Sequence, residues 1–213
     1  MINNYDKIAD YYDRLSRMVF FKSQVNAQIN QLKYIPENST VLIVGGGTGW
    51  ILEELAKVHP AGLHIVYVEI SAKMMALSKA RNIGANTVEF VNMGIEDFSS
   101  SLSFDVISTP FLFDNFSERR AWMIFEKLDD LLKEKGHWLF VDFSLNGERG
   151  KWWKSVFLHV MYVFFKLIRI VEASELIDME PYFKTANYGV IESRLYYGGF
   201  ISALIYHKEN KLA

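Results

Sequence analysis

The residues best suited to chemistry form a glycine-rich turn at positions 45–49, Gly-Gly-Gly-Thr-Gly. The turn follows a short apolar run, 41–44, and precedes apolar residues at helical spacing that begin at Trp50. Glycine permits positive φ and lets a ligand approach bare backbone, and the free N–H groups at a helix start attract carboxylate or hydroxyl oxygens. This strand–turn–helix unit therefore predicts a nucleotide-type binding site.

The glycine spacing narrows the choice of ligand. A dinucleotide fingerprint, Gly-x-Gly-x-x-Gly, uses its third glycine for close packing beside a pyrophosphate. Here glycines stand at 45, 47 and 49, and bulky Trp50 takes the place of that third glycine. A phosphate-binding P-loop is excluded because no Gly-Lys-Ser/Thr follows. The spacing thus disfavours a dinucleotide-dependent oxidoreductase.

An acidic residue, Glu69, follows the next apolar run at 64–68. A carboxylate at the tip of a second strand can accept hydrogen bonds from both hydroxyls of a ribose. Ser71 is a suitable N-cap for the helix that should come next. The second unit therefore predicts a ribose-binding acid beside the glycine turn.

Residues 41–49 are similar to the first motif of class I S-adenosylmethionine-dependent methyltransferases, particularly the group that acts on quinone precursors and similar small molecules. Residues 69–75 resemble the Asp-x-Ser-x-x-Met/Leu stretch of that family, and residues 5–13 resemble its Phe/Tyr-Asp-x-x-Ala-x-x-Tyr-Asp opening. The resemblance implies S-adenosylmethionine as cofactor and in-line methyl transfer to a small, largely apolar acceptor. The implied cofactor contacts are Tyr12, Gly45, Gly46, Gly47, Gly49, Glu69, Ile70, Met74, Ile95, Glu96 and Thr109.

The resemblance also places the acceptor pocket just after the strand expected at 104–109. Its implied contacts are Phe111 and Phe113, with Trp153 from a later segment. A general base is needed only if the acceptor carries a proton at pH 7. Asp114 and Asp142 follow strands and are candidates for that base, but we assign no catalytic residue from the sequence.

Three positions depart from the family pattern, and one of them is Gly46, where the family usually has cysteine or a similar residue. Ile43 replaces an acidic residue two before the first loop glycine, and Gly94 stands near the place of an aspartate that binds adenine. The missing acid favours a second hypothesis, a cofactor-binding protein without catalysis that acts as a membrane-associated or partner-binding module. The retained glycine turn and Glu69 oppose it.

Composition sets the broad class of the protein. A length of 213 residues, half of them hydrophobic, suits a single domain over 1–213. A formal charge of −2 gives no reason to expect nucleic acid as a partner. The chain has no cysteine, and its five histidines lack ligand spacing, so we expect no metal site. Without a signal-like start, we expect a cytoplasmic location.

The order of elements predicts the architecture. Strands alternate with helices as far as 143, which indicates an α/β, doubly wound, Rossmann-like sheet with parallel strands and right-handed crossovers. Residues 190–207 are typical of a hairpin around Gly198-Gly199. The resemblance implies seven strands, mostly parallel, with an antiparallel strand from this hairpin. Residues 5–33 are expected to form N-terminal cap helices.

A helical insert or lid is expected at 150–186, after the fifth strand. Within it, 151–171 combines aromatic and aliphatic residues with a stripe of basic and polar ones. Three interpretations stay open for this segment: a lid on its own sheet, a homodimer interface, or contact with a membrane surface. We predict the lid, because exposing so many aromatic side chains to water is costly.

Overall fold

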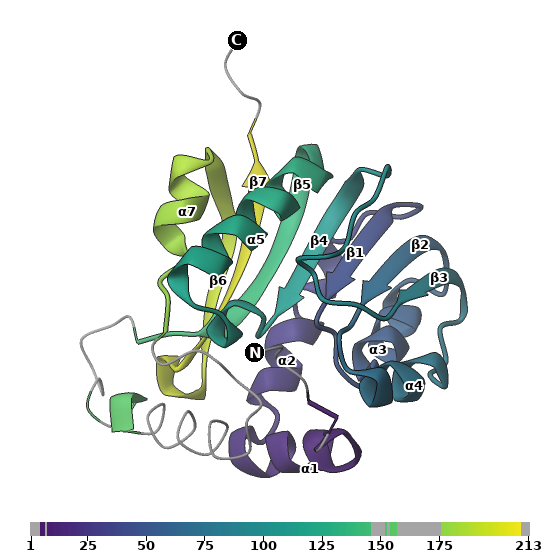
Figure 1. Ribbon diagram of the computed structural model, residues 1–213, viewed down its shortest axis with the longest axis horizontal. Helices are drawn as coiled ribbons and strands as arrows, with labels where there is room; N and C mark the ends of the chain where they lie inside the picture. The colour runs from purple at the N-terminus through teal and green to yellow at the C-terminus, as the bar shows by residue number, and fades with distance from the viewer. Residues whose placement is uncertain (1–4, 7, 146–151, 153, 157–175, 210–213) are drawn as a thin grey trace.

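A seven-stranded sheet forms the centre of the computed structural model, which describes residues 5–6, 8–145, 152, 154–156 and 176–209 (Figure 1). The strand order is β3-β2-β1-β4-β5-β7-β6. The strands are β1 Thr40–Val44, β2 Ala61–Val68, β3 Ala85–Val91, β4 Phe104–Pro110, β5 Leu132–Phe143, β6 Tyr188–Tyr196 and β7 Ile201–Lys208.

Strands β1 to β5 pair in parallel, whereas β7 runs antiparallel to both β5 and β6. The predicted mostly parallel sheet with an antiparallel C-terminal strand is therefore confirmed. The short turn η3 (Tyr197–Gly199) joins β6 to β7, and Gly198 and Gly199 both adopt positive φ there. Because the parallel strands all end at one edge, that edge gathers the loops that can bind a ligand.

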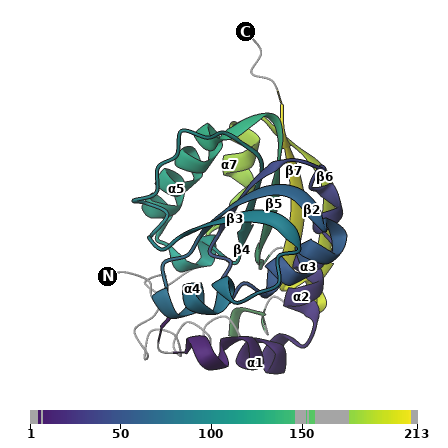
Figure 2. The ribbon, with the colours of Figure 1, turned by 90° about the vertical axis from the view of Figure 1, so that its right-hand side faces the viewer.

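The helices form a layer on each face of the sheet. Figure 2 shows α5 and α7 on one face and α2 and α3 on the other, while α1 lies across the edge where the parallel strands end. The helices are α1 Ala9–Phe20, α2 Ser23–Ile29, η1 Leu32–Tyr34, α3 Trp50–Val58, α4 Ala72–Lys79, η2 Phe113–Asn115, α5 Glu118–Leu131 and α7 Glu180–Thr185.

The core explains why the run 41–44 lacks polar alternation. Leu42 and Val44 pack into the cluster beneath α5, and Val41 and Ile43 pack into the cluster beneath α3. A strand covered on both faces must be apolar at every position. Side chains of this kind contribute roughly 1.5–3 kcal/mol each when fully buried. The core therefore fixes β1, and with it the start of the glycine turn.

The structure defines two helix boundaries. The segment 5–33 breaks into separate helices at Phe21, whose φ is +53°. Helix α5 ends at Leu131, and β5 begins at the next residue. Leu132 pairs with Phe104 of β4, a long-range contact that local sequence signals do not report.

The segment 151–171 lies almost wholly outside the described residues. Of its described part, Trp152 is 77% exposed, and the buried Lys154 donates a hydrogen bond of 2.9 Å to the carbonyl of Gly199. The lid, interface and membrane interpretations remain predictions, as does the role of Trp153. Among the described helices, none has the length and apolar character that crossing a bilayer requires.

Candidate functional site

A cavity lies where the ends of β1, β2 and β4 meet α1 and α2. It brings together ten of the predicted cofactor and acceptor contacts, and the remaining described ones lie elsewhere. The predicted residues that line it are Tyr12, Gly45, Gly46, Gly47, Glu69, Ile70, Met74, Ile95, Glu96 and Phe111.

The glycine turn presents bare backbone to this cavity. Gly45 and Gly47 have φ of +70° and +64°, a region that side chains other than glycine rarely adopt. At Gly47 an added Cβ would meet only the sulfur of Met74, at 3.7 Å, so the space above it is open. The turn can therefore receive a ligand at contact distance.

Gly49, also a predicted cofactor contact, packs closely against a neighbouring helix. Its φ is +75°, and an added Cβ would lie 2.5 Å from Cβ of Ser78 in α4. Gly49 is the N-cap of α3 and lies outside the cavity lining. Its small size thus serves the close packing of α3 against α4.

Position 43 has isoleucine where the family has an acid, and the neighbouring Tyr67 anchors the glycine turn instead. Ile43 pairs in register with Tyr67 of β2, and both side chains lie on the α3 face of the sheet. The fully buried Tyr67 donates a hydrogen bond of 2.9 Å to the carbonyl of Gly47. An added Cβ at Gly46 would lie 2.5 Å from the Tyr67 ring, so Gly46 makes room for it. Tyr67 therefore anchors the glycine turn from below.

Glu69 stands at the tip of β2 with only 4% of its surface exposed. Its two carboxylate oxygens accept backbone N–H groups from Gly47 at 3.0 Å and from Ser71 at 2.8 Å. Burial raises the pKa of Glu69, and those backbone N–H groups oppose the shift. The acid thus ties the glycine turn to the start of α4, where Ser71 caps the helix as predicted by accepting the N–H of Met74 at 3.2 Å.

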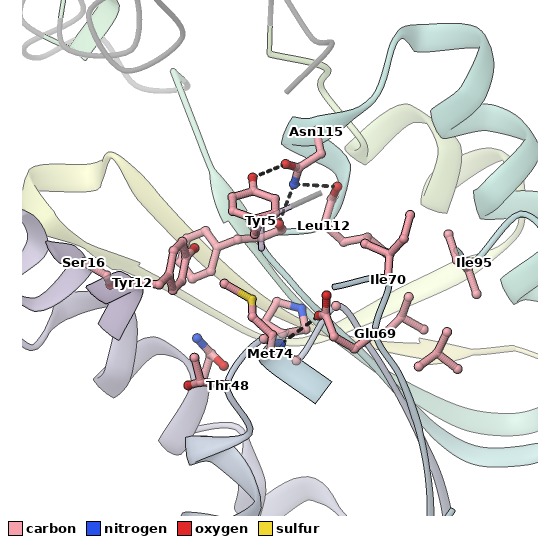
Figure 3. A pocket seen from close by; sticks show the side chains of 18 of the residues that line it. Tyr5, Tyr12, Ser16, Thr48, Glu69, Ile70, Met74, Ile95, Leu112 and Asn115 are labelled. Atoms are coloured by element: carbon pink, nitrogen blue, oxygen red, sulfur yellow. Dashed lines mark hydrogen bonds between the residues drawn. The ribbon is translucent and has the colours of Figure 1, made fainter. Parts of the chain in front are cut away.

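The two sides of Glu69 differ in character. Figure 3 shows Ile70 and Ile95 on one side of it and Tyr12 and Ser16 on the other. Ile70 and Ile95 give the first side an apolar lining. Glu96 also lines that side, but its carboxylate is paired with Arg120 of α5.

Helix α1 closes the cavity through contacts that the sequence did not reveal. The carboxylate of Asp13 accepts the hydroxyl of Thr48 at 2.8 Å and lies 3.4 Å from the guanidinium of Arg81. Just before α1, Asp6 accepts the hydroxyl of Ser71, and Tyr5 donates to Asn115 (Figure 3 shows the latter). Asp13 belongs to the opening motif at 5–13, which was the available signal for a functional role.

Tyr12, also in α1, lines the cavity at the predicted place. Burial raises the pKa of its hydroxyl well above the ordinary value, with a further contribution from the charge of Asp114. Tyr12 is therefore a neutral hydrogen-bonding group at any ordinary pH.

Two predicted contacts lie in the core instead of the cavity. Thr109 is fully buried, and its hydroxyl accepts the indole N–H of Trp138 at 2.9 Å. Phe113 is 1% exposed and packs against Trp138 and Phe140. Phe111, by contrast, lines the cavity with a φ of +51°, a strained value for a phenylalanine.

Asp114 and Asp142, the two candidates for a general base, lie in and beside the short helix η2. Asp142, at the end of β5, accepts the N–H of Phe113 at 3.1 Å and of Phe143 at 2.8 Å. Burial raises the pKa of Asp142 to about 7 despite these N–H groups. Burial and the neighbouring charge of Asp142 raise the pKa of Asp114. Asp142 thus positions η2, and neither acid lines the cavity.

Within the described ranges, no three His, Asp or Glu side chains gather in a way that could hold a metal ion.

Residues 41–136 match the model of a methyltransferase domain family. Two curated relatives are ubiquinone/menaquinone biosynthesis C-methyltransferases, from Geotalea daltonii at 29% identity and from Geotalea uraniireducens at 26%. Each match extends over 147 residues, which is 66% of this chain and 61% of the relative. The similarity thus spans less than two thirds of those proteins.

Solved structures with the same fold cover nearly the whole chain. A complex of DhpI with SAH aligns with a TM-score of 0.70 at 15% identity, over 97% of this chain and 94% of that one. The 1,6-didemethyltoxoflavin-N1-methyltransferase of Burkholderia thailandensis aligns with a TM-score of 0.67 at 13% identity, over 96% of this chain and 86% of that one. The chain is thus similar in sequence to a methyltransferase domain and to C-methyltransferases of quinone biosynthesis, and similar in fold to S-adenosylmethionine-dependent methyltransferases.

Proposed function

We propose that the protein transfers the methyl group of S-adenosylmethionine to a small-molecule acceptor. The observation that carries the proposal is the pairing of bare backbone at Gly45 and Gly47 with buried Glu69 in one cavity. Each oxygen of Glu69 accepts one N–H in this structure, and a carboxylate oxygen has room for a second donor. Glu69 can therefore also accept the hydroxyls of a ribose, and the residues present fit the cofactor.

The remaining contacts follow from the cavity lining. Ile70, Met93 and Ile95 offer an apolar slot for an adenine ring. Trp50 lines the cavity at the start of α3, where a dinucleotide site would need a small residue. The lining thus supports a single nucleoside better than a dinucleotide.

The cofactor supplies an activated methyl group on a sulfonium, so the protein has only to align the acceptor and exclude water. Helix α1, held down through Asp13 and Asp6, covers the strand ends for this purpose. Pro110, Phe111 and Phe116 form an apolar wall next to the glycine turn. This wall supports a largely apolar acceptor, and the names of the curated relatives make an aromatic carbon of a reduced quinone precursor the first candidate for the attacking atom.

The loss of the acid at Ile43 does not weaken this proposal. Tyr67 and Glu69 together hold both polar groups of the Gly47 backbone, its carbonyl and its N–H. The glycine turn is therefore anchored without an acid at position 43. The missing acid was the argument for a non-catalytic module, so that hypothesis loses its main support.

Titration calorimetry with S-adenosylhomocysteine and with NAD tests the cofactor. We expect binding of the first at micromolar concentration and none of the second. Incubation with methyl-labelled S-adenosylmethionine and reduced demethylated naphthoquinones, followed by mass spectrometry, tests the reaction. Preferential binding of NAD would overturn the proposal.

We also propose that the segment 151–171 forms a lid over the acceptor site. Sedimentation with anionic vesicles, comparing the wild type with Trp152→Ala/Trp153→Ala, separates a lid from a membrane contact. Vesicle binding that the double change abolishes would contradict the lid. Unchanged sedimentation with altered acceptor turnover would support it.

A further inference from the structure

Helix α1 presents large apolar side chains to water on its outer face. Tyr11, Met18 and Phe21 are 70%, 69% and 71% exposed. Tyr11 and Met18 lie about two helical turns apart on the same face, and Phe21 follows at the C-cap of the helix. A single exposed apolar side chain is ordinary on a protein surface, but a row of three along one short helix marks an interaction surface.

Phe21 is the most unusual member of this row. Its backbone has a φ of +53° and a ψ of −123°, which is strained for a phenylalanine. The preceding Phe20 is buried and packs against Phe143 and Phe200, so the core takes the first ring and the second is left in water. Strained residues that add little to the core gather at sites where a protein binds a partner. The strain therefore supports a function for the exposed Phe21 ring.

The charged side chains of the same helix and its C-terminal end are mainly basic. Among residues 9–22, all of which the structure describes, Arg14, Arg17 and Lys22 are exposed cations, whereas Asp10 is the one exposed anion. This excess contrasts with the formal charge of −2 for the whole chain. Basic groups set among aromatic and aliphatic side chains are typical of a helix that lies in the surface of an anionic bilayer, where cations meet phosphates and apolar groups enter the acyl boundary.

We propose that the outer face of α1 docks on the surface of an anionic phospholipid bilayer. The docking face consists of Tyr11, Arg14, Met18, Phe21 and Lys22. Contacts on the inner side hold the helix in place, since Asp13 accepts the hydroxyl of Thr48 and the carbonyl of Val19 accepts the hydroxyl of Tyr197 at 3.0 Å.

The position of α1 gives this docking a consequence for the cavity. The helix lies across the edge where the parallel strands end, and its inner side contributes Tyr12, Asp13 and Ser16 to the cavity lining (Figures 1 and 2). A docked molecule therefore turns the cavity edge toward the bilayer, in which apolar small molecules concentrate. Docking itself does not depend on the proposed methyl transfer, but it brings a largely apolar acceptor close to the site.

Sedimentation with vesicles tests the inference on the full chain. The wild type should bind vesicles that contain about one third phosphatidylglycerol at least about tenfold more strongly than vesicles of phosphatidylcholine alone. Raising the salt concentration from about 0.1 to about 0.5 M should weaken this binding, because salt screens exposed charges. Arg14→Gln/Lys22→Gln should weaken it about 10- to 30-fold, and Met18→Ser/Phe21→Asn at least about tenfold. Asparagine is used at position 21 because it tolerates positive φ.

Two matched double variants serve as controls. Lys57→Gln/Lys79→Gln removes exposed cations from the last turns of α3 and α4, and Leu102→Asn/Met123→Ser removes exposed apolar side chains outside α1. Both should bind anionic vesicles like the wild type. Thermal unfolding of every variant within about 3 °C of the wild type shows that a loss of binding is not a loss of fold.

Three results would overturn the docking face. The first is a wild type that does not sediment with anionic vesicles, and the second is binding that both α1 variants retain. The third is binding that only Trp152→Ala/Trp153→Ala abolishes, which would assign the membrane contact to the segment 151–171. Calorimetry with S-adenosylhomocysteine is independent of all three, so a failure of docking and a failure of the proposed function are distinguishable.

Discussion

Replacing Gly46 by alanine tests how the glycine turn is held. Gly46 does not have a positive φ, so its backbone accepts alanine without strain. The obstacle is Tyr67, because the new Cβ would lie 2.5 Å from Cε2 and from the hydroxyl oxygen, and 2.6 Å from Cζ. Tyr67 is fully buried and cannot retreat toward solvent.

The magnitude follows from two losses. Forcing one extra carbon into a packed core costs about 1–3 kcal/mol. Displacing the Tyr67 hydroxyl also removes its hydrogen bond to Gly47, a further loss of roughly 1 kcal/mol. We therefore expect Gly46→Ala to lower the free energy of unfolding by about 2–4 kcal/mol, or the melting temperature by roughly 5–15 °C.

A double-variant cycle isolates the cause. In a Tyr67→Leu background the ring is gone, so Gly46→Ala should cost less than about 0.5 kcal/mol there. Urea unfolding of the four proteins gives the coupling free energy. Gly189→Ala in β6, far from the turn, is the control and should cost the same in both backgrounds. Equal costs of Gly46→Ala with and without the Tyr67 ring would refute the argument.

Three further predictions concern charged groups. Glu69→Ala should weaken binding of S-adenosylhomocysteine by about 2–3 kcal/mol, roughly 30- to 150-fold by calorimetry, and unchanged affinity in a folded variant would show that the ribose is held elsewhere. Because burial raises the pKa of Asp142 from its ordinary 3.8 to about 7, the folded state retains a proton that the unfolded chain has lost, so this group's contribution to stability falls as pH rises from 4 to 7. Urea unfolding at pH 5 and pH 8 should show a smaller loss in Asp142→Asn than in the wild type, and equal losses would contradict the assignment. Asp13→Asn weakens the contacts of α1 with Thr48 and Arg81, so S-adenosylhomocysteine should dissociate about 3- to 10-fold faster. Trp50 fluorescence follows the dissociation, and the control Asp10→Asn, outside the cavity lining, should match the wild type.

Local sequence patterns were sufficient for the sheet and for the centre of the site. The run 41–44 is buried on both faces because it contains no polar residue, and Ser71 caps α4 because its hydroxyl lies within reach of the N–H three residues later. Gly45 and Gly47 adopt positive φ next to Glu69 at the strand ends. The apolar run and the helix cap depend on residues within a few positions of one another, so spacing and residue type determine them. Gly47 and Glu69 are 22 positions apart and meet because parallel strands end at one edge of the sheet.

Contacts between distant segments were decided only by the tertiary structure. Thr109 and Phe113 lie close in sequence to the apolar wall formed by Pro110, Phe111 and Phe116, yet strand register and the packing of Trp138 turn both side chains into the core. The bond between Asp13 and Thr48 joins residues 35 positions apart, and its neighbour Arg81 lies 68 positions from Asp13. Such pairs form because the sheet brings α1, the glycine turn and α4 to one edge, and that arrangement is a property of the whole packed core, which no single stretch of sequence specifies.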